Sequence, residues 1–131
     1  MLISAKEIEL LINTARQARE KAYAPYSGFL VGAALLTADG QVYTGCNVEN
    51  ASYGLTCCAE RVAVYKAVSE GQKQFLAMAI IADTEDYCSP CGACRQVLVE
   101  FAPGMIVFMC NKHGQYEQCM AGELLPSYFS L

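Results

Sequence analysis

The chain has 131 residues and a net charge of −4, with 17% of its residues charged. This length supports one domain, residues 1–131, whose hydrophobic core is large enough to be stable without disulfides or a bound metal. Thirteen acidic residues against nine basic ones, with no cluster of Lys or Arg, argue against nucleic acid or an anionic membrane as partner. We therefore expect the partner to be a small molecule.

The chain shows no sign of export or membrane insertion. No stretch reaches the roughly eighteen apolar residues of a membrane span, and the N-terminus lacks the basic start and apolar block of a signal peptide. We therefore expect a cytoplasmic protein. In that compartment the eight cysteines are reduced thiols or metal ligands rather than disulfides.

The first segment predicts a helix that runs to about Tyr23. Ser4 and Glu7 have the spacing of a capping box, and Pro25 stops the helix. Between these signals, apolar residues recur at helical spacing: Ile8, Leu11, Ile12, Ala15, Ala18 and Ala22.

Two strands should follow as a hairpin. The runs Val31–Thr37 and Gln41–Gly45 flank Asp39-Gly40, a dipeptide typical of tight reversals.

Two further helices are predicted to begin at cysteines. One runs from Cys58 to Glu70 and is closed by Gly71. The other runs from Cys91 to Phe101, with Ser89 and Pro90 as its cap and first position.

The remaining apolar runs predict strands. Phe75–Ala82 is continuously apolar, which suits a central strand covered on both faces, and therefore a three-layer α/β/α arrangement. Met105–Cys110 is a second such strand. A weak final strand, Tyr116–Met120, precedes a short helical piece that ends at Pro126.

Three of the cysteines suggest a metal site. Cys91-Gly92-Ala93-Cys94 is a C-x-x-C at a helix start, a pattern shared by metal sites and thioredoxin-type redox pairs. Cys58, also at a helix start, supplies a third thiol. Helix N-termini stabilise thiolates, and Arg61 can offset further negative charge.

The character of the metal site depends on its fourth position. Three protein ligands leave a position open, as in catalytic zinc sites, whereas a fourth ligand would make the site structural. Cys57, Cys88 and His113 are candidates for that closure. Glu60 favours the catalytic alternative, because in the first turn of a helix its carboxylate can stand beside the metal.

Cys58-Ala59-Glu60 and Pro90-Cys91-Gly92-Ala93-Cys94 together resemble the signature of zinc nucleoside and nucleobase deaminases. The resemblance is to short, homotetrameric cytidine deaminases, which implies an α/β fold with a mixed five-stranded sheet. This sequence departs from the family pattern at two positions. Cys57 adds a second thiol beside the ligand position, and Gly28 stands where the family often has a basic residue. The resemblance extends through Ala24-Pro25-Tyr26-Ser27, Phe29-Leu30-Val31-Gly32-Ala33-Ala34, Gly45-Cys46-Asn47-Val48-Glu49-Asn50 and Leu124-Leu125-Pro126.

The resemblance implies a reaction in pyrimidine salvage. One Zn²⁺ per subunit, held by Cys58, Cys91 and Cys94, carries a hydroxide that attacks C4 of cytidine, and of deoxycytidine as well. Glu60 shuttles protons, so that uridine and ammonia form.

The resemblance also implies how a nucleoside is held. The Ala59 amide binds the base carbonyl and the Ser89 carbonyl accepts from the amine, while Phe29 packs on the base. Asn47 and Glu49 hold the ribose 3′-hydroxyl. Three residues are expected at contacts between subunits: Ala51, Tyr53 and Phe129.

Two rival activities use the same zinc chemistry. A deaminase that edits nucleic acid needs a basic channel, which the net charge disfavours. A deaminase for a modified nucleoside or nucleoside antibiotic would use Asn47 and Glu49 for different groups.

Overall fold

Five strands form one mixed sheet in the computed structural model, which describes residues 3–131. The strand order is β2-β1-β3-β4-β5, with β3 and β4 parallel and the other neighbours antiparallel. The mixed five-stranded sheet is confirmed. The strands are β1 (Val31–Thr37), β2 (Val42–Cys46), β3 (Phe75–Ala82), β4 (Ile106–Cys110) and β5 (Tyr116–Met120).

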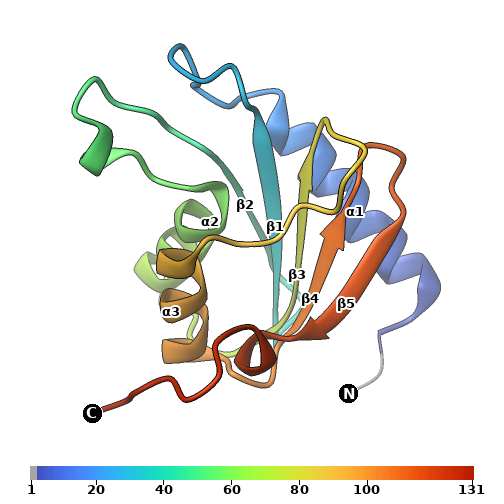
Figure 1. Cartoon of the computed structure of the whole chain (residues 1–131). Helices are drawn as coiled ribbons and strands as arrows, with labels where there is room; N and C mark the ends of the chain where they lie inside the picture. The colour runs from blue at the N-terminus through green and yellow to red at the C-terminus, as the bar shows by residue number, and fades with distance from the viewer. Residues whose placement is uncertain (1–2) are drawn as a thin grey trace.

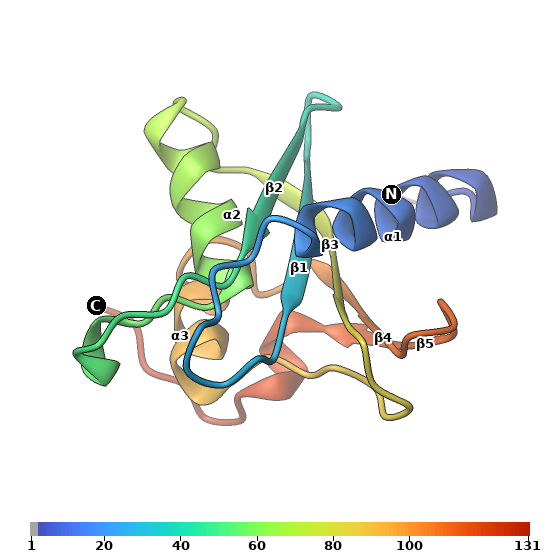
Figure 2. The same cartoon turned by 90° about the horizontal axis from the view of Figure 1, so that it is seen from above.

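Helices cover both faces of this sheet (Figures 1 and 2). Helix α1 (Ala5–Arg19) lies on one face, and α2 (Ala59–Ser69) and α3 (Gly92–Phe101) lie on the other. Two short 3₁₀ turns, η1 (Tyr53–Leu55) and η2 (Ala121–Leu124), complete the elements. The predicted three layers are confirmed. None of the helices within residues 3–131 combines the length and the apolarity that crossing a membrane requires.

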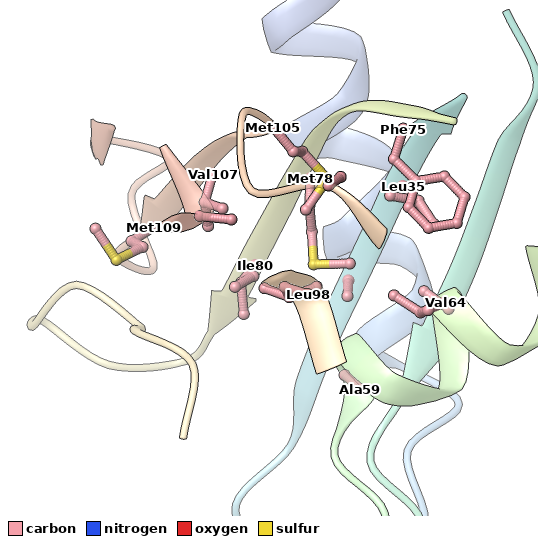
Figure 3. Close-up of a cluster of buried hydrophobic side chains, with 14 of the residues drawn as sticks. Leu35, Ala59, Val64, Phe75, Met78, Ile80, Leu98, Met105, Val107 and Met109 are labelled. Carbon is pink, nitrogen blue, oxygen red and sulfur yellow. The ribbon is translucent and has the colours of Figure 1, made fainter. Parts of the chain in front are cut away.

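The central strand β3 explains why both faces need cover. Its side chains alternate between the two cores, so that Ala79 and Ile81 pack toward α1 while Met78 and Ile80 pack toward α2 and α3 (Figure 3). The run is apolar throughout because neither face meets water.

Two glycines allow helices to approach the sheet closely. A Cβ on Gly32 would lie 2.0 Å from the Ala15 carbonyl oxygen of α1, and one on Gly45 would lie 2.2 Å from the Ala59 carbonyl oxygen of α2. Because any larger residue would collide with helix backbone, these glycines set the depth at which each helix sits. Gly45 thereby fixes the position of the first turn of α2.

Helix α1 is shorter than predicted, since it ends at Arg19 rather than near Tyr23. The Tyr23 amide donates to the Asn47 carbonyl, and the Tyr23 carbonyl accepts from the Glu49 amide. The chain therefore leaves the helix to pair with residues 47–49, a distant contact that helical spacing does not reveal.

The predicted start of α3 is wrong by two residues. The N-cap is Cys91, not Ser89, and the helix begins at Gly92 rather than at Pro90. The Cys91 sulfur accepts a hydrogen bond from the Cys94 amide at 3.5 Å. A thiol therefore takes the capping role expected of a hydroxyl. Elsewhere the Ser4–Glu7 capping box is confirmed, and the bounds of β2 and β4 differ from the prediction by one residue.

A three-thiol metal centre beside a cavity

Three thiols from two helix N-termini meet at one point. Cys58 is the N-cap of α2, Cys91 is the N-cap of α3, and Cys94 lies in the first turn of α3. Their sulfur atoms all lie within 4.8 Å of one another, and those of Cys58 and Cys91 are 3.6 Å apart. Tetrahedral zinc, with Zn–S bonds of about 2.3 Å, holds its sulfurs about 3.8 Å apart. The donor set therefore fits zinc.

The other candidate ligands lie outside this cluster. Within residues 3–131, no fourth Cys, His, Asp or Glu joins the three sulfurs. The ring of His113 is instead 3.1 Å from a Glu85 carboxylate oxygen. The described residues thus leave a fourth position open, which is the arrangement of a catalytic rather than a structural site. The third thiol also distinguishes the site from a thioredoxin-type pair.

Hydrogen bonds and charge favour thiolate at Cys58. Its hydrogen bond with the Cys94 thiol, assisted by Arg61, lowers the pKa of Cys58 from 9.0 to about 5. The same sharing of one proton raises the pKa of Cys94. The guanidinium of Arg61 lies 3.5 Å from the Cys58 sulfur. Three thiolates around Zn²⁺ leave one net negative charge, which a cation at this distance offsets.

Glu60 lies beside the thiols and is only 4% exposed. Burial raises the pKa of its carboxyl from 4.5 to about 7, and the nearby Cys58 adds to that rise. A carboxyl that titrates near neutrality can both accept and release a proton during a reaction. A divalent cation in the thiol cluster would draw the pKa downward, toward the carboxylate form.

A cavity of ≈ 200 Å³ opens onto the thiol cluster and Glu60. Phe29 stands in its wall with 47% of its surface exposed, so one face of the ring is free to meet a ligand. The cavity is lined by Phe29, Val31, Asn47, Thr56, Cys58, Ala59, Glu60, Cys88, Ser89 and Cys91. Five residues that the sequence predicts for the site therefore share this cavity with two of the predicted metal ligands, Cys58 and Cys91: Phe29, Asn47, Ala59, Glu60 and Ser89.

Asn47 and Glu49 already bind the backbone around this cavity. The Asn47 side chain accepts from the Val31 amide at 2.9 Å and donates to the Phe29 carbonyl at 2.7 Å. Glu49 accepts from the Tyr26 amide at 2.9 Å, from the Ser27 amide, and from the Ser27 hydroxyl, which lowers the pKa of its carboxyl. Both residues hold the segment 26–31 that carries Phe29.

Four residues predicted to bind substrate do not line this cavity in their own chain: Glu49, Ala51, Tyr53 and Phe129. Glu49 lines the neighbouring cavity instead. Ala51 and Tyr53 are exposed, and the rings of Tyr53 and Tyr26 pack edge to face with centroids 6.0 Å apart. Phe129 is 69% exposed on the C-terminal tail, which extends away from the sheet (Figure 1).

Sequence reasoning missed Thr56 in the cavity wall, and it considered Cys88 only as a fourth metal ligand. Thr56 lines both this cavity and a neighbouring one of ≈ 410 Å³ that also involves Tyr26 and Glu49. Cys88 lines the wall as a thiol whose pKa burial raises to about 12, so it stays protonated. The signal for both was proximity in sequence to Cys58 and Cys91, because residues just before a helix N-terminus share its environment.

An open three-thiolate zinc site with a buried carboxyl beside a small cavity defines a zinc hydrolase centre. The chain belongs to the cytidine and deoxycytidylate deaminase family, because the model of the family's zinc-binding region matches residues 5–110. Family and donor set agree that zinc is the metal.

Relatives support this membership over nearly the full chain. A cytidine deaminase of Sporosarcina psychrophila is 54% identical over 125 residues, covering 95% of this chain and 92% of the relative. One of Halalkalibacterium halodurans is 53% identical, covering 93% of each. A solved cytidine deaminase structure from Burkholderia pseudomallei superposes with a TM-score of 0.91 at 49% identity, covering 97% of this chain and 100% of that one.

Proposed function

We propose that the protein catalyses the hydrolytic deamination of cytidine, and of deoxycytidine, to the uracil nucleoside and ammonia, as a step in pyrimidine salvage. The observation that carries this proposal is the convergence of three thiols and a buried glutamate on one small cavity. Full-length similarity to cytidine deaminases supports the choice of substrate. The net charge of −4 disfavours a polymeric nucleic acid in its place.

Glu60 is the proposed proton shuttle. Zinc held by Cys58, Cys91 and Cys94 supplies Lewis-acid activation of the attacking water. Glu60 would accept one proton from that water and pass it to N3 of the ring. After the oxygen has added to C4, Glu60 would take the remaining proton of the added hydroxyl and deliver it to the amino group, so that the C4–N bond breaks and ammonia leaves. Its burial excludes bulk water that would otherwise compete for the proton.

Backbone groups and one aromatic ring would orient the base. Ala59 begins α2, so its amide is one of those that no carbonyl of the helix engages, and it is free to donate to the base carbonyl. The Ser89 carbonyl would accept from the amino group that leaves. Phe29, half exposed in the cavity wall, would pack against the planar base.

Asn47 and Glu49 are proposed to bind the ribose 3′-hydroxyl. The Asn47 amide nitrogen carries two hydrogens and uses one on the Phe29 carbonyl, which leaves one for a ligand. Glu49 is held as a carboxylate by Ser27 at the edge of the adjacent cavity, and a carboxylate oxygen has a further lone pair for a hydroxyl.

We further propose a homotetramer of single-domain subunits, residues 1–131, in the cytoplasm. Tyr53 and Phe129 are large and exposed, and exposed aromatic side chains mark surfaces that bind other proteins. A neighbouring subunit would bring Phe129 to the cavity, with Ala51 and Tyr53 crossing the same interface. The absence of any disulfide among the eight cysteines of the described chain suits a reducing compartment.

One assay tests the activity directly. Purified, zinc-loaded protein should convert cytidine and deoxycytidine to their uracil counterparts with one ammonia released per turnover. The zinc content, measured on the same sample, should be one ion per chain. Fully loaded protein that releases no ammonia from either nucleoside would refute the proposal.

A further inference from the structure

Of the three thiols, Cys91 is the one that packing holds least. Cys94 is buried and Cys58 is partly buried, whereas Cys91 is exposed. Cys91 also precedes its helix, since it is the N-cap rather than a helical residue. Because a metal site needs its donors fixed to within a fraction of an ångström, polar contacts must restrain the Cys91 backbone.

Arg95 supplies those contacts from one turn into α3. Its side-chain Nε donates to the Pro90 carbonyl at 2.7 Å, and its backbone amide donates to the Cys91 carbonyl at 3.0 Å. The two carbonyl groups on either side of the Cys91 Cα are therefore both held by one residue. Those two peptide planes fix the direction of the Cys91 Cα–Cβ bond, which leaves its sulfur only the few staggered positions about that bond.

The other end of the guanidinium reaches a distant part of the chain. Nη1 of Arg95 donates to the Leu124 carbonyl at 2.9 Å, at the end of η2. Residues 125–131, including Phe129, follow directly from that point. A planar guanidinium can serve two carbonyls that lie in different directions, whereas a lysine ammonium presents its donors from one atom.

We propose that Arg95 is a positioning residue that holds the Cys91 zinc ligand and the root of the C-terminal tail in one fixed relation. Arg95 is not one of the three thiol residues and does not itself line the cavity. It acts through the Pro90–Cys91 backbone on one side and through Leu124 on the other. The inference rests on the proposed function only in taking Cys91 as a ligand and Phe129 as part of a neighbour's site.

The rate of zinc release tests the first half of the proposal, the positioning of Cys91, and the measurement needs no nucleoside. Zinc transfer from the protein to an excess of a chromophoric chelator should be about 10-fold or more faster for Arg95→Gln than for the unchanged protein, the usual scale for losing a group that orients a ligand. Arg95→Lys, which can keep the Pro90 contact alone, should be intermediate. Release from Arg95→Gln within twofold of the unchanged protein would overturn the proposal.

Two controls separate positioning from general stability. Arg16→Gln removes the same charge from a partly buried arginine of α1 whose guanidinium donates to the Asn13 side chain. Ile81→Val weakens the core on the α1 side of the sheet, away from the thiols. Neither should speed zinc release, even where the thermal midpoint falls as far as in Arg95→Gln. If Ile81→Val releases zinc as fast as Arg95→Gln, the effect is one of stability and the proposal fails.

The second half of the proposal concerns the mobility of the C-terminal tail. Because the chain contains no tryptophan, a tryptophan introduced on the tail reports that mobility without background. Phe129→Trp places a single indole on the tail, and its fluorescence anisotropy should drop when Arg95→Gln is added. An unchanged anisotropy would overturn the C-terminal half of the proposal. Because none of these readouts uses cytidine, protein that fails to deaminate but still shows the zinc and anisotropy effects would refute the proposed function and leave the role of Arg95 intact.

Discussion

Replacing Glu60 with glutamine tests the carboxyl at the centre of the proposed mechanism. Glutamine keeps the shape of the side chain but can neither accept nor deliver a proton. We expect kcat for cytidine to fall by about 10²- to 10⁴-fold, the usual contribution of general acid–base catalysis. Zinc content should stay at the level of the unchanged protein. A kcat within a factor of three of the unchanged enzyme would remove Glu60 from the mechanism.

The same substitution has a distinct signature in stability. The folded-state pKa of Glu60 is about 7 against 4.5 for the free group, so between those two values the folded protein holds a proton that the unfolded chain has released. The contribution of Glu60 to the free energy of unfolding of the metal-free protein therefore falls as pH rises through this window. The difference in pKa corresponds to about 3 kcal/mol when both limits are reached.

Glu60→Gln removes this loss of stability at high pH, because glutamine carries no charge at any pH. In urea denaturation of metal-free protein under reducing conditions, the variant and the unchanged protein should be equally stable near pH 4. Near pH 8 the variant should be more stable, by up to about 3 kcal/mol. Glu9→Gln, at an exposed position of α1, should show no such dependence. A stability difference that does not change with pH would refute the reasoning about burial.

Two further changes test the C-terminal tail and the close packing of α2 against the sheet. Deleting the last three residues, 129–131, should abolish most cytidine turnover while zinc content is unchanged, and retained activity would contradict a shared site. Gly45→Ala would force its Cβ against the Ala59 carbonyl and should lower stability by about 3 kcal/mol in urea denaturation and weaken zinc retention. Gly54→Ala, where nothing lies within 4 Å of the new Cβ, is the matched control and should change neither. Equal behaviour of the two alanine variants would show that α2 can move without cost.

The sheet and its two layers of helices were predictable because they follow from local patterns. The unbroken apolar run Phe75–Ala82 has no polar face, and such a strand is stable only when covered on both sides. The cysteines at two helix starts likewise follow from short-range signals, and these were enough to predict the thiol cluster.

What sequence patterns missed depends on distant contacts. The end of α1 is set by the pairing of Tyr23 with residues 47–49, some 25 positions along the chain. The roles of Arg95 and Thr56 arise only when the loops before α2 and α3 and the C-terminal segment come together. No periodicity in a window of ten or so residues carries that information.

The use of Cys58 as both helix cap and metal ligand restricts how the chain can change in length. Each residue of a helix advances by about 100° around its axis, so one residue inserted between Cys58 and Glu60 would turn the carboxyl away from the metal. The loop 50–56 before Cys58 contains no α-helix or strand, only the short turn η1, so its length is not tied to a helical repeat. Insertions and deletions are therefore expected to accumulate among relatives ahead of that cysteine, while the two-residue step to the glutamate stays constant.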